Sequence, residues 1–205
     1  MLGHPHGSGG PRASMRQVST PPAVVLGSLT CFAALSRPDL LAEPVTAALT
    51  ASGLEAYVAA IDADLADTDN FCAHYGVPLA ASANAVVVRG VRGETERFAV
   101  CMTLATRRLD VNGVVRKRLD ARKASFAPLE ETVSRTGMEY GGITPVGVPA
   151  DWPVWVDGAV ADQPWLCIGS GIRGSKLFVP AATLLGLPGA ERVDGLARAI
   201  PHEAV

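Results

Sequence analysis

Two glycine-rich segments carry the clearest chemical signal in this sequence of 205 residues. They are Thr-Gly-Met-Glu-Tyr-Gly-Gly-Ile-Thr-Pro-Val-Gly at residues 136–147 and Gly-Ser-Gly-Ile-Arg-Gly-Ser-Lys-Leu at residues 169–177. Glycine lets the main chain adopt positive φ and lets backbone amides come close to a ligand. Two such loops in a short chain therefore predict a pocket whose walls are mostly backbone.

A few polar side chains are expected to complete this pocket: Asn84, Thr144, Asp157, Ser170 and Arg173. The chain has no GxSxG elbow and no HExxH pair, so neither a serine nucleophile nor a zinc site is indicated. We expect no cofactor and no metal. What remains is a pocket lined by backbone, with a few polar groups.

Residues 169–174 also match the GxGxxG pattern of dinucleotide-binding proteins. That pattern works where it opens a helix in a βαβ unit. Here Ser175–Pro180 has the composition of a strand, and little chain follows it. A tight turn that lines the pocket is the better interpretation.

The acidic segment at residues 62–70 is spaced like a calcium loop, but it lacks the central glycine and the closing glutamate. We interpret Asp67 or Thr68 as the N-cap of a helix that runs through His74 and is stopped by Gly76.

A basic stretch occurs between Arg107 and Lys123, and its centre is Arg116-Lys117-Arg118. These three residues are candidates for RNA-backbone contact, because cations that neutralise phosphates release counterions. The alternative interpretation is a solvated helix face.

Composition limits the remaining possibilities. Hydrophobic residues make up 48% of the chain and charged ones 19%, which is enough to build one core. The net charge of −2 gives no general attraction to DNA or to a membrane, and no apolar run reaches the roughly 18 residues of a membrane span. The four cysteines lie far apart, which fits a reducing cytoplasm rather than zinc or disulfides.

The composition along the chain also indicates the domain organisation. Residues 1–22 are rich in Gly, Ser, Pro and His and are expected to be a disordered leader before one domain at residues 23–205. Helices are predicted at residues 39–52, 67–74, 111–119, 129–136 and 181–187. Strands are predicted at residues 57–61, 85–89, 98–104, 154–157, 165–168 and 176–179. Without βαβ regularity, this order predicts an α+β fold with a mixed β-sheet packed by helices.

The chain resembles the YbaK/EbsC family of aminoacyl-tRNA deacylases, which is related to the editing domain of bacterial prolyl-tRNA synthetases. The resemblance covers about Ala59 to Leu196. Its carriers are the segments 82–88, 108–110, 123–127, 136–147, 156–157 and 169–174.

This resemblance implies trans-editing, which is the hydrolysis of the ester that joins a wrong amino acid to tRNA. It implies that backbone amides of the two glycine-rich loops stabilise the oxyanion, and that a water or the substrate's own groups complete the reaction. It implies catalytic roles for Asn84, Gly141, Gly142 and Pro145. It implies substrate binding by Thr144, Gly147, Asp157, Gly169, Ser170, Gly171 and Arg173. The implied partners are mischarged tRNA and an aminoacyl-tRNA synthetase.

One position departs from the family pattern. Many members carry a functional lysine where this chain has Asn84, and an asparagine supplies hydrogen bonds but no charge. The second hypothesis is therefore a non-catalytic module that binds tRNA or an aminoacyl group and has lost the chemistry.

Overall fold

The computed structural model describes residues 20–200. Its helices are α1 Ala23–Leu26, α2 Glu43–Ser52, α3 Thr68–Tyr75, α4 Arg116–Arg118, α5 Leu129–Thr136, α6 Gly158–Ala161 and α7 Ala181–Leu185. Its strands are β1 Phe32–Ala33, β2 Tyr57–Ala60, β3 Ala83–Arg92, β4 Thr95–Leu104, β5 Arg107–Leu109, β6 Lys123–Phe126, β7 Val154–Asp157, β8 Trp165–Gly169, β9 Ser175–Pro180, β10 Ala190–Val193 and β11 Ala197–Ala199.

The larger sheet is mixed and has the order β10-β7-β4-β3-β6. Its centre is the long β3–β4 hairpin, which closes through a two-residue turn between Arg92 and Thr95. Gly93 holds a φ of 61° in this turn, a value that glycine adopts without steric cost. Strands β7 and β10 add in parallel on one side, and β6 adds antiparallel on the other.

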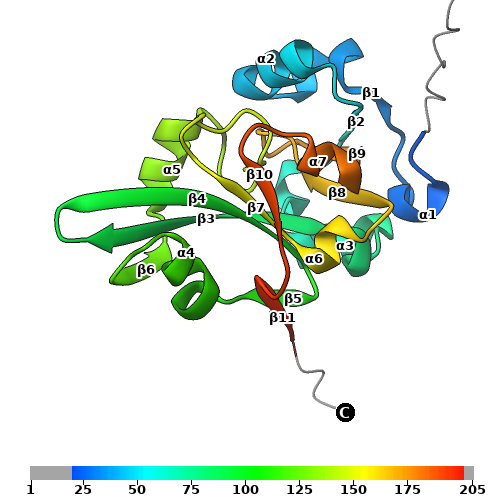
Figure 1. The fold of residues 1–205 in the computed structure, drawn as a ribbon. Coiled ribbons are helices and arrows are strands. Elements are labelled where there is room, and N and C mark those ends of the chain that lie inside the picture. The colour runs from blue at the N-terminus through cyan, green and yellow to red at the C-terminus, as the bar shows by residue number, and fades with distance from the viewer. Residues whose placement is uncertain (1–19, 201–205) are drawn as a thin grey trace, which may run out of the picture.

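A second sheet, of order β1-β2-β9-β8, is antiparallel throughout. A single parallel bridge between Ser82 and Cys167 connects the start of β3 to β8, so the two sheets meet where β3 begins. Figure 1 shows α5 on one side of the larger sheet and α4 on the other. A short pair of strands, β5 and β11, completes the topology.

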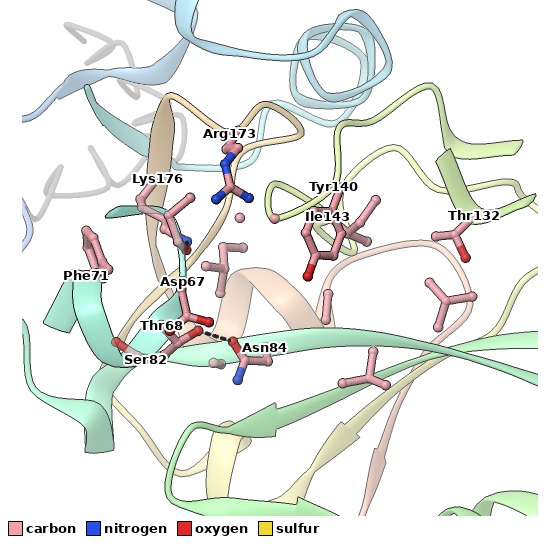
Figure 2. Close-up of a pocket in the computed structure, with 18 of the residues that line it drawn as sticks. Asp67, Thr68, Phe71, Ser82, Asn84, Thr132, Tyr140, Ile143, Arg173 and Lys176 are labelled. Atoms are coloured by element: carbon pink, nitrogen blue, oxygen red, sulfur yellow. Dashed lines mark hydrogen bonds between the residues drawn. The ribbon is translucent and has the colours of Figure 1, made fainter. Parts of the chain in front are cut away.

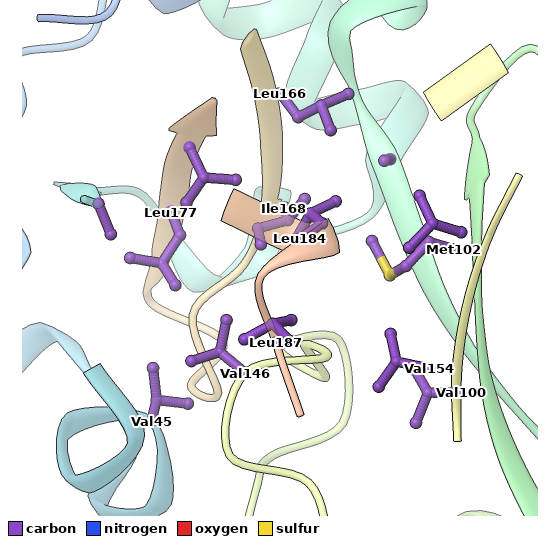
Figure 3. Packing of buried hydrophobic residues seen from close by; sticks show 14 of the residues in the cluster. Val45, Val100, Met102, Val146, Val154, Leu166, Ile168, Leu177, Leu184 and Leu187 are labelled. Atoms are coloured by element: carbon purple, nitrogen blue, oxygen red, sulfur yellow. The ribbon is translucent and has the colours of Figure 1, made fainter. Parts of the chain in front are cut away.

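The main core lies between the two sheets, α2 and α7 (Figure 3). Alternate residues of β4 point into it, since Val100 and Met102 are fully buried there. Strands β8 and β9 contribute apolar side chains from the other sheet, among them Leu166, Ile168 and Leu177. The fold is thus a mixed α/β single domain, as the sequence predicts.

Several of the predicted elements differ in their bounds from the observed ones, and two predicted helices differ most. The helix predicted from Asp39 begins only at Glu43, because Pro44 fits the first turn of a helix but not its interior. Residues 111–115 form a π-helical turn that Asp110 caps at Gly113, and a short α-helix follows it. The strands β1, β5, β6, β10 and β11 were not predicted.

Residues 1–19 of the predicted leader lie outside the described residues. No helix between residues 20 and 200 is both long and apolar enough to cross a bilayer.

Candidate active site

A cavity of about 490 Å³ opens where the two sheets meet (Figure 2). Its wall is built from the start of α3, the first half of β3, the end of β8 and the loop before Ile143. Residues from β6 and α5 close one side, and Arg173 and Lys176 close the other. All lining residues fall between residues 66 and 176.

The N-terminus of α3 forms one edge of the cavity. Asp67 caps this helix by accepting a hydrogen bond from the amide of Asp69 at 3.2 Å, and Gly76 ends it with a φ of 71°. Thr68, the first residue of the helix, donates from its hydroxyl to the Oδ1 atom of Asn84 at 2.8 Å. This bond fixes the amide of Asn84 at the cavity wall, where the sequence analysis expected it.

The two glycine-rich loops contact each other more than they face the cavity. The amide of Gly171 donates to the carbonyl of Gly142 at 2.7 Å, and the amide of Glu139 donates to the carbonyl of Gly171 at 2.8 Å. A Cβ atom on Gly142 would lie 2.5 Å from the carbonyl carbon of Ile172. Gly142 therefore permits close packing between the loops, whereas Gly171 permits close packing against the start of α2, where a Cβ atom would lie 2.4 Å from that of Ala42.

Arg173 lies at the rim of the cavity, above Asn84 in Figure 2. Its amide donates to the carboxylate of Glu139 at 2.7 Å, which holds the second loop against the first. Its guanidinium lies 5.8 Å from the ring centroid of Tyr140, whose side chain is 64% exposed. Arg173 itself is half-buried, so its guanidinium lies beside an exposed ring at the edge of the cavity.

The structure brings together four of the residues expected at the site: Asn84, Gly141, Gly169 and Arg173 all line the cavity. The others lie apart from it. Pro145 and Gly147 line a smaller, apolar pocket beside α2. Thr144 and Ser170 are fully buried, and the hydroxyl of Ser170 is bonded to that of Ser175 at 2.6 Å.

Asp157, expected to bind substrate, is not among the residues that line the cavity. Its carboxylate is fully buried and accepts from the amides of Ala197 at 3.0 Å and Ala159 at 3.3 Å. The Nε atom of Arg107 lies 3.1 Å from Oδ2. Asp157 therefore caps α6 and ties β11 to the larger sheet.

The three basic residues Arg116, Lys117 and Arg118 also lie away from the cavity. None of them is among the residues that line it. Arg118 forms an ion pair with Glu191 and lies over the ring of Trp155 at 4.9 Å. Arg116 donates to the carbonyl of Asn112 at 2.8 Å. Lys117 is exposed, so any contact with RNA would extend the binding surface beyond the cavity.

Two cysteines lie at or near the cavity, but neither is a candidate nucleophile. Cys167 lines the wall, and burial raises the pKa of its thiol far above the usual range. Burial also raises the pKa of Cys72, whose sulfur lies 3.1 Å from the hydroxyl of Ser82. Since the thiolate is the reactive form, both thiols are inert at neutral pH.

Sequence reasoning missed six polar residues of the cavity wall, which are Asp67, Thr68, Ser82, Thr132, Tyr140 and Lys176. The sequence contains a signal that could have identified one of these residues. Lys176 is the only charged residue in the strand 175–180, and a lone lysine in a buried strand is unusual.

The family model for the aminoacyl-tRNA editing domain matches residues 62–187, a range that contains every residue of the cavity wall. A comparison with curated proteins gave no match.

Two solved structures are similar to this chain in fold. The hypothetical protein APE2540 has a TM-score of 0.66 at 20% identity, covering 76% of this chain and 100% of its own. A protein proposed to be a trans-editing enzyme for prolyl tRNA synthetase has a TM-score of 0.63 at 23% identity, covering 75% of this chain and 94% of its own. The match over residues 62–187 confirms the family resemblance: the chain belongs to the aminoacyl-tRNA editing domain family.

Proposed function

We propose that this protein is a trans-editing hydrolase that cleaves the ester bond of mischarged aminoacyl-tRNA. The cavity is the observation that carries the proposal. At about 490 Å³ it is within the range of about 300–1,000 Å³ for small-molecule sites. It lies entirely inside the segment that matches the editing domain.

The groups at the cavity favour attack by water rather than by a side chain. No thiolate is available there, and the hydroxyl of Ser82 lies 3.3 Å from the carbonyl of Pro78, to which it donates. Within residues 20–200, no group of three or more His, Cys, Asp or Glu side chains is placed to hold a metal ion.

Backbone amides can stabilise the charge that develops in such a reaction. Among the described residues, neither the amide of Gly141 nor that of Ile143 donates to an acceptor. Both residues line the cavity. If these two amides point at the reacting carbonyl, they would stabilise an oxyanion without reorganising during the reaction.

The hydrolysis balances without a cofactor. Water adds to the ester carbonyl carbon, the bond from that carbon to the ribose oxygen breaks, and a proton from the water passes to the leaving ribose hydroxyl. The products are a free amino acid and uncharged tRNA. Asn84, held by Thr68, would orient the ribose or the water.

Binding of the RNA itself would begin at Arg173, whose charge lies at the rim, and would extend to Arg116, Lys117 and Arg118. Mischarged tRNA is then the substrate, an aminoacyl-tRNA synthetase is a candidate partner, and the cytoplasm is the place of action.

The test is the release of labelled amino acid from a panel of mischarged and correctly charged tRNAs. Hydrolysis without protein is the background. We expect release from at least one mischarged tRNA and much slower release from its correctly charged counterpart. Tight binding of tRNA with no release from any member of the panel would instead identify a non-catalytic binding module.

A further inference from the structure

Lys176 is a buried cation that lines the cavity. The reaction proposed above gives this residue no role. Only 7% of the residue is exposed. Strand β9 is central in the second sheet, where Lys176 pairs with Ala59 of β2 on one side and Gly169 of β8 on the other. Its backbone is therefore fixed, and Figure 2 shows its side chain at the cavity wall opposite Tyr140 and Ile143.

The ammonium group of Lys176 has an incomplete set of partners. Its Nζ atom donates to the carbonyl of Ala66 at 3.0 Å and lies 5.1 Å from the ring centroid of Phe71. No carboxylate oxygen of the described chain lies within 4.0 Å of it, since it takes part in none of the ion pairs there. An ammonium has three donors, so two remain for a ligand.

The surroundings also shift its protonation. Burial is the largest effect and lowers the pKa of Lys176, and the charge of Arg173 lowers that pKa further. The carboxylate of Asp67 acts in the opposite direction. Burial without a counter-ion costs stability, and such groups are concentrated at functional sites.

Position within the cavity indicates which part of the substrate Lys176 meets. Arg173 is at the rim, beside the exposed ring of Tyr140, where an RNA phosphate can reach it, whereas the ammonium of Lys176 is enclosed. A small aminoacyl group can enter that far. Asn84 is close to the same space but carries no charge, so Lys176 is the cation available to the reacting ester.

We propose that Lys176 is a catalytic residue that donates a charge-assisted hydrogen bond to the carbonyl oxygen of the aminoacyl ester. This inference rests on the proposed function. When water adds to the carbonyl carbon, the π electrons move onto that oxygen, and the ammonium stabilises the resulting oxyanion without giving up its proton. The oxyanion then re-forms the carbonyl and expels the ribose oxygen, which takes the proton that came from water.

The experiment compares Lys176→Met and Lys176→Arg with wild type in single-turnover deacylation, using the mischarged tRNA that wild type hydrolyses fastest. Arg192→Met is the matched control, because it removes an exposed cation on β10, outside the cavity. We expect Lys176→Met to lower the rate constant by about 100- to 1,000-fold, the loss typical of one oxyanion donor. Lys176→Arg keeps the charge and should lose less, and Arg192→Met should match wild type.

A pH profile separates catalysis from a structural role. The ratio of the wild-type rate to uncatalysed hydrolysis should fall as the pH rises through the lowered pKa of Lys176. The Lys176→Arg variant should show no such fall, because a guanidinium stays protonated. Of the groups that face Lys176, Arg173 stays charged, and burial raises the pKa of Cys72 and Cys167.

Failure of the inference and failure of the function are distinguishable. If wild type hydrolyses a mischarged tRNA and a folded Lys176→Met protein is equally fast, the role of Lys176 is overturned while the function stands. If wild type hydrolyses none, the function falls, and binding of 3′-alanylamino-3′-deoxyadenosine decides the role of Lys176. A loss of affinity of 10-fold or more in Lys176→Met then supports carbonyl binding, and equal affinity refutes it.

Discussion

Replacing Asp157 by alanine tests whether this carboxylate supports the fold or the substrate. The side chain of Asp157 is 1% exposed, and that of its partner Arg107 is 27% exposed. The change would leave two backbone amides, those of Ala159 and Ala197, without their acceptor. Arg107 would keep its bond to the carbonyl of Ala197 at 2.7 Å but lose its counter-ion.

The size of the effect follows from this geometry. Leaving a buried backbone donor without its acceptor costs about 1–3 kcal/mol, so the two amides together cost about 2–6 kcal/mol. That is a large part of the roughly 5–15 kcal/mol by which native domains are stable. For a chain of this size about 2–4 °C is lost per kcal/mol, so the melting temperature should fall by roughly 4–24 °C.

The assay is thermal unfolding followed by near-UV circular dichroism, with Asp151→Ala as the matched control. Asp151 is exposed on the loop before β7, so its replacement should change little. Deacylation would be measured at a temperature where every variant is folded, and we expect Asp157→Ala to be active there. A protein that melts with wild type but has lost substrate affinity would refute the structural assignment.

Three further predictions concern the loops, the RNA surface and Asn84. Gly142→Val should destabilise the protein by about 1–3 kcal/mol or more in urea unfolding, because its side chain meets backbone rather than an open cleft; an unchanged urea midpoint would contradict the packing argument. Replacing Arg116, Lys117 and Arg118 by alanine should weaken tRNA binding and reduce its salt dependence by roughly one counterion per lost phosphate contact. Equal affinity and salt slope would make them an ordinary solvated face. Asn84→Ala should slow deacylation by about 10- to 1,000-fold, as for one lost donor, and a wild-type rate would leave the chemistry to the other groups at the cavity.

The elements with strong local signals were predictable from the sequence. Helix α3 begins after Asp67 and ends at Gly76, and α5 ends at Gly137, as their capping residues indicated. Capping depends on residues within one turn of the helix end, so it can be read without tertiary information. Short strands such as β10 depend instead on pairing with distant partners, and local sequence gave no sign of them.

The candidate site was predictable only in part. The glycine-rich loops were identified from the sequence. A sequence shows that a glycine can adopt unusual backbone conformations, but it does not show which atom packs against that glycine in the fold. For Gly142 that atom belongs to Ile172 rather than to a ligand. Asp157 and Lys176 also show that a sequence alone does not tell whether a side chain lies inside or outside the cavity. One carboxylate expected at the pocket is buried elsewhere, and a lysine from a strand reaches the cavity through its place in the sheet.

The support behind the second glycine-rich loop comes from chain that precedes the matched editing region, 62–187. The amide of Ala42 donates to the carbonyl of Ser170 at 3.3 Å, and the hydroxyl of Ser175 donates to the carbonyl of Leu40 at 2.6 Å. The region that defines the family is therefore smaller than the unit that folds. A fragment cut at residue 62, or a graft of the matched region into another protein, would carry the whole cavity wall and lack the backing that keeps one of its loops in place.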